Sequence, residues 1–141
     1  VKRILVAEDE DVIRDFVVIN LRRNGYEVVD VPNGDEAIRV FDENNGDFDI
    51  CLLDIMMPGM DGFELVEQMR QYREFPVIML TAKSQSKDKL RGFSLGIDDY
   101  VTKPFDPDEL MARVKTILKR YSINSSNVVK IGDVIFDGDK I

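Results

Sequence analysis

Short apolar runs recur along this chain, and each is followed by a segment whose apolar residues recur at helical spacing. The runs lie at residues 2–7, 26–31, 49–54, 76–81 and 99–102. The 49–54 run is apolar at nearly every position, which is typical of a strand buried on both faces of a parallel sheet. The pattern therefore predicts five strands separated by helices.

The segments between the runs carry the signals of helix starts, stripes and ends. The first predicted helix begins near the acidic residues 9–11 and ends at Asn24-Gly25. Its apolar stripe consists of Ile13, Phe16, Val17 and Leu21. Further helices are predicted at residues 35–43, 63–69 and 86–95, and a long one begins at Asp106-Pro107. This alternation predicts an α/β fold, a doubly wound five-stranded parallel sheet with helices on both faces.

The last stretch has a different pattern. Residues 121–127 are polar and rich in serine and asparagine, which is typical of a linker. Residues 128–131 and 134–136 read as short β segments around a turn at Gly132-Asp133. We therefore predict one domain over residues 1–120, a linker at 121–127 and the start of a second domain at 128–141.

Composition narrows the classes of function. The 141 residues are 44% hydrophobic and carry a formal net charge of −8. A net-negative domain without a basic stripe is a poor direct binder of DNA, because neutralising phosphates drives nonspecific affinity. The chain has no histidine. This absence excludes a histidine phosphocarrier, acid–base catalysis by histidine and zinc sites that contain histidine.

The single cysteine and the hydropathy of the chain bear on the cellular compartment of the protein. Cys51 is the one cysteine and lies inside an apolar run, so it cannot form an internal disulfide and packs as a small hydrophobe. A reduced, cytoplasmic setting fits this use. No apolar stretch approaches the roughly 18–20 residues of a membrane span, and no signal peptide is evident. We expect no membrane partner.

Charged and hydroxyl residues stand at the ends of four of the apolar runs. Glu8-Asp9 follow the first run, Asp54 and Thr81 close the third and fourth, and Lys103 follows the fifth. Ends of parallel strands meet at one rim of the sheet, where ligands bind. Carboxylates with water and phosphate oxygens are ligands that Mg²⁺ prefers. The pattern predicts a site for Mg²⁺ and a phosphoryl group, with Asp54 as the carboxylate that attacks phosphorus.

Each of these residues also has an ordinary structural interpretation. Asp9 could cap the first helix, and Asp54 could open an Asx turn before Pro58. Lys103 could be a solvated loop lysine, and threonine is common at strand ends. The coincidence of all of them at strand ends favours the functional interpretation.

The chain resembles a response-regulator receiver domain of two-component signalling over residues 1 to about 120. The matching segments are Ile4-Leu5-Val6-Ala7-Glu8-Asp9-Glu10, Leu53-Asp54-Ile55-Met56-Met57-Pro58-Gly59-Met60-Asp61-Gly62, Leu80-Thr81-Ala82 and Asp98-Asp99-Tyr100-Val101-Thr102-Lys103-Pro104-Phe105. The resemblance implies a flavodoxin-like strand order of 2-1-3-4-5. It also implies a sensor histidine kinase as the phosphoryl donor and a cytoplasmic location.

The resemblance assigns roles to the matched positions. Asp54 would be the phosphoacceptor. The Mg²⁺ ligands would be Glu8 (through water), Asp9, Asp54 and the main-chain carbonyl of Met56. Thr81 and Lys103 would bind the phosphoryl group, and Tyr100 would swing inward with the threonine. Glu8 departs from the family pattern, because aspartate is commoner at this position. The Glu8 carboxylate is therefore expected to extend differently into the outer coordination shell of the metal.

Charged residues near the end of the first domain resemble those of regulators with a winged-helix (OmpR/PhoB-type) DNA-binding domain. The implied pairs between subunits are Lys89 with Glu109, Asp98 with Arg120, and Asp99 with Arg113. A solvated helix face is the alternative for any one of them. The resemblance implies a homodimer through the last helix–strand–helix face. Promoter DNA would bind only through a C-terminal domain that is largely missing from residues 1–141.

Three other functions share parts of this pattern. A haloacid-dehalogenase-type phosphatase would need a second aspartate two residues after the nucleophile, where this chain has Met56. A flavodoxin-like cofactor binder would need a Ser/Thr/Gly-rich loop after the first strand. A stand-alone receiver that signals through protein contacts is the closest alternative, and the segment after residue 121 argues against it. We expect a phosphoacceptor signalling protein and not an enzyme.

Overall fold

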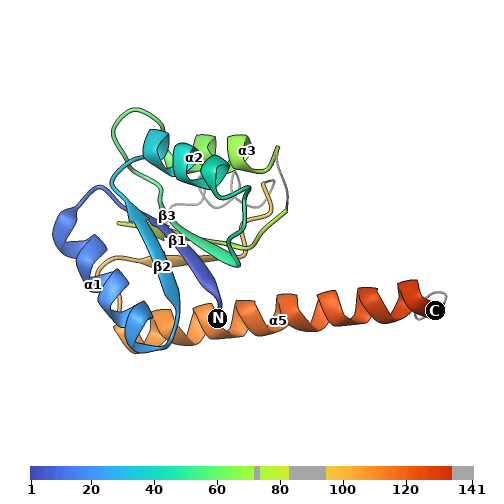
Figure 1. Cartoon of the computed structure of the whole chain (residues 1–141). Helices are drawn as coiled ribbons and strands as arrows, with labels where there is room; N and C mark the ends of the chain where they lie inside the picture. Colours follow the sequence, from blue (N-terminus) through green and yellow to red (C-terminus); the bar gives the residue numbers. More distant parts are fainter. Residues whose placement is uncertain (72–73, 83–94, 135–141) are drawn as a thin grey trace.

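The predicted fold class is confirmed by the computed structural model, which describes residues 1–71, 74–82 and 95–134. Five strands form one parallel sheet in the order β2-β1-β3-β4-β5 (Figure 1). The elements are β1 (Arg3–Ala7), α1 (Asp11–Arg23), β2 (Glu27–Val31), α2 (Gly34–Glu43), β3 (Ile50–Asp54), α3 (Gly62–Met69), β4 (Val77–Thr81), β5 (Asp99–Thr102) and α5 (Pro107–Val134). The sequence prediction for residues 86–95 falls almost entirely outside the described residues.

Each face of the sheet carries its own hydrophobic core, because successive strand residues point to opposite faces. In β1, Leu5 and Ala7 join the core under α2 and α3, whereas Ile4 and Val6 join the core under α1 and α5 (Figure 1). All four side chains are fully buried. Double-sided cover explains why the central strands are continuous apolar runs in the sequence.

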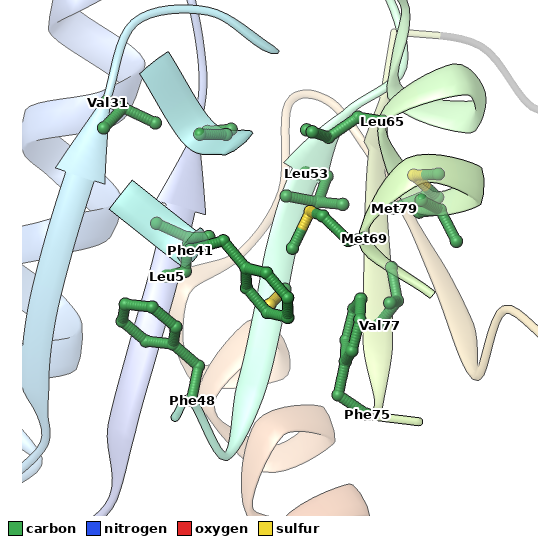
Figure 2. Close-up of a cluster of buried hydrophobic side chains, with 14 of the residues drawn as sticks. Leu5, Val31, Phe41, Phe48, Leu53, Leu65, Met69, Phe75, Val77 and Met79 are labelled. Carbon is green, nitrogen blue, oxygen red and sulfur yellow. The ribbon is translucent and has the colours of Figure 1, made fainter. Parts of the chain in front are cut away.

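Figure 2 shows the core beneath α2 and α3, where aromatic rings fill the space over the lower half of the sheet. The ring centroid of Phe41 lies 5.2 Å from that of Phe75 and 6.2 Å from that of Phe48. All three rings are buried. These rings belong to the core on one face of the sheet, whereas the predicted site residues stand at the carboxyl ends of the strands.

Local side chains set the starts of α2 and α3. The side chain of Asn33 accepts a hydrogen bond from the Glu36 backbone amide at 2.8 Å and begins α2. Asp61 and Glu64 form a reciprocal capping box at the start of α3. The expected capping role of Asp9 is not found, because the N-cap position of α1 is Glu10, whose side chain makes no capping bond.

The predicted stripe of α1 needs one correction. Val17 and Leu21 are buried as predicted, and Ile13 is partly buried against the same core. Phe16, however, is 42% exposed and contacts Phe105 with a ring centroid distance of 6.3 Å. The residues that face the sheet recur every four positions from residue 13, and Phe16 lies at the edge of that stripe.

The structure also differs from the sequence prediction after residue 120. Helix α5 begins as predicted, with the Asp106 side chain accepting from the Asp108 amide at 2.8 Å, and continues to Val134 (Figure 1). The predicted linker and the first β segment are therefore helical here. A short β segment needs a neighbouring strand, whereas a helix satisfies its backbone hydrogen bonds within itself. The division into domains at residues 120 and 128 stays a prediction.

Within the described parts of the chain, no helix combines the length and the apolar character that crossing a bilayer requires.

Candidate functional site

Three carboxylates converge at the carboxyl ends of β1 and β3. Glu8 and Asp9 directly follow β1, and Asp54 is the last residue of β3. One oxygen from each lies within 4.8 Å of the other two. Glu8 is fully buried and Asp54 is 3% exposed, while Asp9 is half-buried. The neighbouring register of β1 and β3 therefore brings together residues that are 45 positions apart in sequence.

Lys103 supplies a positive charge to this cluster. Its Nζ atom lies 2.7 Å from Glu8 Oε1, 3.3 Å from Asp54 Oδ2 and 3.9 Å from Glu10 Oε1. The side chain is only 12% exposed, so Lys103 is not a solvated loop lysine. Burial alone would lower the pKa of Lys103, but contact with Glu8 and the charge of Asp54 outweigh it and raise that pKa. The lysine therefore stays charged.

Asp54 is held in an unusual electrostatic state. Burial raises the pKa of Asp54 to about 7, and the charge of Glu8 and a hydrogen bond with Asp9 act in the same direction. The charge of Lys103 and the Met56 backbone N–H act in the opposite direction but do not cancel the rise. Crowded carboxylates repel one another when all are ionised. A divalent cation or a proton would relieve this repulsion.

The predicted Asx turn is present and coexists with the cluster. The backbone N–H of Met56 donates to Asp54 Oδ1 at 3.2 Å. This bond holds one oxygen of Asp54 toward the loop while the other faces Lys103. The Met56 side chain is 73% exposed. The structure thus places Met56 beside Asp54, and the assignment of its carbonyl as a metal ligand stays a prediction.

Thr81 and Tyr100 lie on adjacent strands near the same rim. Thr81 ends β4 and is 5% exposed, and its register partner on β5 is Thr102. Tyr100 is partly buried and packs against the core under α2 and α3. Its register partner is Met79, which is two residues before Thr81. The two residues occupy the expected strands, and their coupled movement stays a prediction.

The cluster fits a hard divalent cation. Three carboxylates share this cluster with one ammonium group, so the cluster keeps an excess of negative charge when its members are ionised. Oxygen donors from a few carboxylates, completed by water and phosphate oxygens, are the coordination that Mg²⁺ prefers. Glu8 Oε1 is engaged with Lys103, whereas Asp9 and Asp54 have oxygens that face the shared space.

Two residues that support the site were missed by sequence reasoning. A Cβ atom at Gly62 would lie 2.5 Å from the Asp54 carbonyl oxygen, so α3 approaches the end of β3 as closely as only glycine allows. Arg14 on α1 donates to the Glu8 carbonyl oxygen at 2.8 Å. The Gly62 requirement has a weak sequence signal in its position at a helix start. A lone arginine on an amphipathic helix has none.

An apolar groove of about 500 Å³ adjoins the cluster. It runs between the start of α1 and the loop after β5, and Val12 in its wall is 83% exposed. Its lining consists of Glu10, Val12, Ile13, Phe16, Ala82, Lys103, Pro104 and Phe105. Because Lys103 belongs to both, the groove opens directly beside the predicted phosphoacceptor.

The residues predicted for a dimer face gather on another surface, formed by the start of β5 and one side of α5. A pocket of about 420 Å³ is lined there by Asp98, Asp99, Glu109, Arg113 and Arg120, together with Ala112, Thr116 and Ile117. Lys89, the sixth predicted residue, lies outside the described residues. The structure therefore brings together all of the described members of the set.

Several of these charges have partners within the chain. Arg113 lies 2.6 Å from Asp99 Oδ2 and 3.6 Å from Glu109 Oε2. Asp98 accepts from the Val77 amide at 2.8 Å. The sequence predicts the Asp99–Arg113 pair between subunits, whereas here it forms within one chain because β5 and α5 lie side by side. The intersubunit pairs stay predictions.

Comparison with known proteins agrees with the geometry. The response regulator receiver domain family matches residues 4–115. The regulatory protein VanRc of Enterococcus gallinarum is 47% identical over 120 residues, which cover 85% of this chain and 51% of the relative. PhoP of Bacillus subtilis, a transcriptional regulatory protein of alkaline phosphatase synthesis, is 46% identical over 123 residues, with 86% and 50% covered. The chain spans about half the length of these curated relatives.

Solved structures show the same architecture. A receiver domain protein from Methanospirillum hungatei matches with a TM-score of 0.83 and 30% identity, covering 88% of this chain and 98% of that one. The receiver domain of a Francisella response regulator matches with a TM-score of 0.77 and 36% identity, covering 86% and 99%. With the acids and the lysine placed at the strand ends, this chain belongs to the response regulator receiver domain family.

Proposed function

We propose that this chain is the regulatory part of a transcriptional response regulator that is activated when Asp54 is phosphorylated. The observation that carries the proposal is the position of Asp54, a nearly buried carboxylate 3.3 Å from Lys103 and beside two further acids. Such a carboxylate can act as a nucleophile toward phosphorus without a neighbouring base. The phosphoryl donor would be a phosphohistidine of a sensor histidine kinase.

The transfer exchanges one bond to phosphorus for another. A carboxylate oxygen of Asp54 attacks the phosphorus of the phosphohistidine, and the P–N bond breaks. Its electron pair stays on the histidine nitrogen, which takes up a proton from solvent. Mg²⁺, held by Asp9, Asp54 and the Met56 carbonyl with Glu8 acting through water, would neutralise charge on the phosphoryl oxygens. Lys103 lies where it would bind one of those oxygens.

The apolar groove supports a protein donor. A small acyl phosphate needs only the cluster, whereas a kinase must bring a large surface close to Asp54. Val12, Phe16 and Phe105 present apolar area beside Lys103, and exposed apolar area of this kind marks protein contacts. We propose that the phosphohistidine-bearing element of the kinase covers this groove.

The output is proposed to be dimerisation. The phosphoryl group would draw Thr81 toward it and let Tyr100 move inward, and the shifted state would pair through the surface of β5 and α5. The charged residues Asp98, Asp99, Glu109, Arg113 and Arg120 gather on that surface, which supports the proposal. A winged-helix domain beyond the receiver would then bind promoter DNA.

Turnover of phosphate esters is not supported by the site. The exposed side chain of Met56 stands where a phosphatase would carry its second aspartate. The protein would therefore carry out only transfer to its own Asp54 and slow loss of that phosphoryl group to water.

The test is intact mass after incubation with Mg²⁺ and acetyl phosphate, with Asp54→Asn and Asp47→Asn in parallel. We expect one phosphoryl group on the wild type and on the exposed-site control Asp47→Asn, and none without Mg²⁺ or in Asp54→Asn. If the wild type stays unmodified, beryllofluoride binding to Asp54 would distinguish a short-lived phosphate from an inactive site. A phosphoryl group that persists in Asp54→Asn would overturn the proposal.

A further inference from the structure

Arg14 connects the turn that carries the acidic residues to two neighbouring elements. Its Nη1 atom donates to the Glu8 carbonyl oxygen at 2.8 Å, and its Nε atom donates to Asp30 Oδ2 at 3.2 Å. Its Nη2 atom donates to Asp11 Oδ1 at 2.6 Å. One guanidinium therefore joins the end of β1, the end of β2 and the start of α1.

The turn between β1 and α1 has little else to hold it from the helix side. Helix α1 lacks a side-chain cap at Glu10, although such a cap commonly stabilises a helix start by about 1 kcal/mol. Within the turn, the Glu10 backbone N–H donates to Glu8 Oε2 at 3.0 Å. The backbone N–H of Arg14 donates to the Glu10 carbonyl oxygen at 2.9 Å. Arg14 thus contacts the turn through both its main chain and its side chain.

The three contacts of the guanidinium differ in strength. The Arg14 side chain is 15% exposed and Asp30 is 32% exposed, whereas Asp11 is 80% exposed. Exposed ion pairs contribute little, so the bonds to the Glu8 carbonyl and to Asp30 are the ones that hold the turn. These two bonds use two different nitrogens of the forked guanidinium group, because the Glu8 carbonyl and Asp30 belong to different strand ends. Lysine carries its donors on a single nitrogen, so it cannot place two separate nitrogens against these two acceptors as the guanidinium does.

Arg14 is not placed to bind the phosphoryl group itself. Each of its three nitrogens already has a protein acceptor, and none of these acceptors is Asp54. The residue between its two anchors on the turn is Asp9, which the proposed function assigns as a direct Mg²⁺ ligand. Any motion of the Glu8 carbonyl therefore changes where the Asp9 carboxylate stands.

We propose that Arg14 is a positioning residue that fixes the β1–α1 turn in the geometry needed to bind Mg²⁺. The inference rests on the proposed Mg²⁺ site and adds a residue that touches neither metal nor phosphoryl group. Loss of an outer partner of this kind weakens metal binding by about tenfold or more. The same loss is expected here for Mg²⁺ in the absence of any phosphoryl donor.

The sign of the change separates positioning from simple charge. Removal of a positive charge near an acidic cluster would, by electrostatics alone, strengthen the binding of a cation. Loss of positioning would weaken it. Arg14→Gln removes both the charge and the fork, and Arg14→Lys removes the fork alone. Positioning predicts weaker Mg²⁺ binding in both variants.

The experiment measures the Mg²⁺ dissociation constant by calorimetry for the wild type, Arg14→Gln and Arg14→Lys, with amide NMR spectra to establish that each is folded. Arg39→Gln is the matched control, because Arg39 also contacts two carboxylates, Glu36 and Glu43, but on α2 away from the site. We expect about tenfold weaker binding for both Arg14 variants, and a change of less than twofold for Arg39→Gln.

The outcomes are distinct. If the wild type does not bind Mg²⁺, the proposed metal site is wrong, and the proposed role of Arg14 is wrong with it. If the wild type binds and Arg14→Gln binds more tightly or within threefold, the positioning role is overturned. If Arg14→Gln does not fold, Arg14→Lys decides alone, since it keeps the charge and removes only the two separately directed hydrogen bonds. Weakening by more than threefold supports the inference, and a smaller change overturns it.

Discussion

Lys103 Nζ lies 2.7 Å from Glu8 Oε1 and 3.3 Å from Asp54 Oδ2. The lysine ammonium is thus closer to Glu8 than to Asp54, the predicted phosphoacceptor. Glutamate has one methylene more than the aspartate that is commoner at this position of the family, and this extra length lets the residue that follows β1 reach across to the loop after β5. One mostly buried ammonium therefore contacts two buried carboxylates and neutralises part of their charge.

Lys103→Met is expected to destabilise the protein most at high pH. In the metal-free protein at pH 8, the loss is about 3 kcal/mol of unfolding free energy, because a buried carboxylate pair loses its cation. At pH 6 the loss is smaller, since Asp54 can take up a proton. Urea unfolding at both pH values measures the difference, with the exposed Lys115→Met on α5 as control. Equal losses at both pH values would contradict the assigned charge balance.

Asp54→Asn is expected to stabilise the metal-free protein above neutral pH. The pKa of Asp54 is about 7 when folded and near 3.8 when unfolded, so the folded state binds the proton more tightly. The stabilising contribution of protonated Asp54 to the free energy of unfolding is fully present below pH 4 and is lost as pH rises through about 7. At pH 8 the variant should gain about 1–2 kcal/mol, because each pKa unit corresponds to about 1.4 kcal/mol and solvent screens part of it.

Urea unfolding of the wild type and Asp54→Asn from pH 4 to pH 8 measures this effect. The difference between the two curves isolates Asp54 from the other acids. Asp15→Asn, on an exposed position of α1, controls for the loss of one carboxylate. Parallel curves for the wild type and Asp54→Asn would show that the folded protein does not favour the proton at this site.

The strand-end residues could be predicted because their signals are local. An apolar run followed by an acid or a lysine marks both the strand and its end, and parallel order brings those ends to one rim. Glu8, Asp9, Asp54 and Lys103 therefore lie together as the sequence predicts. The separate runs do not show which strand ends are neighbours. The register of β1 with β3 and of β4 with β5 supplies that information.

The residues that were missed depend on distant contacts. Arg14 reaches Asp30, 16 positions away, and no periodic pattern marks that contact. Phe16 has the spacing of a buried residue but lies at the edge of its stripe, beside Phe105. The helix at residues 121–134 replaces a predicted linker and β segment, because composition alone does not decide between a helix and strands that need a partner.

Mg²⁺ affinity is expected to rise with pH up to about pH 7 and then level off. The cation requires Asp54 to be ionised, and the proton bound below pH 7 must be displaced. The dissociation constant should therefore increase about fivefold from pH 7 to pH 6, because Asp54 is half protonated at pH 7 and almost fully protonated at pH 6. Calorimetry in buffers of different ionisation enthalpy would also count the released proton. A pH-independent affinity with no proton release would contradict the raised pKa of Asp54.

Phe16→Ser is expected to separate the two kinds of phosphoryl donor. Phe16 lines the apolar groove but does not contact the carboxylate cluster. Phosphorylation by acetyl phosphate should be unchanged, whereas transfer from a phosphorylated sensor kinase that is active on the wild type should slow about tenfold. Ile19→Ser is the matched control, because Ile19 is similarly exposed on α1 but does not line the groove. Equal slowing with both donors would place Phe16 in the chemistry or the fold instead.

Arg120→Glu is expected to abolish dimerisation of the activated protein without affecting its phosphorylation. Arg120 is exposed on α5 and lines the proposed dimer face, near Asp98. In the proposed dimer, Arg120 of one subunit faces Asp98 of the other, and the twofold axis repeats this pair. Charge reversal at position 120 would therefore place two negative charges against each other at both pairs. Sedimentation of the beryllofluoride-activated protein would show monomers for Arg120→Glu and dimers for the wild type.

The control for this prediction is Lys119→Glu, which changes the same charge at the adjacent exposed position but does not line the pocket. Its dimer should remain. Asp98→Arg alone should fail to dimerise, and the double variant with Arg120→Glu should recover dimers, because the pair is restored in the opposite sense. Asp98 also accepts a bond from the Val77 amide, so each variant needs an unfolding curve to separate lost folding from lost pairing. Activated Arg120→Glu that still dimerises as tightly as the wild type would exclude this face as the interface.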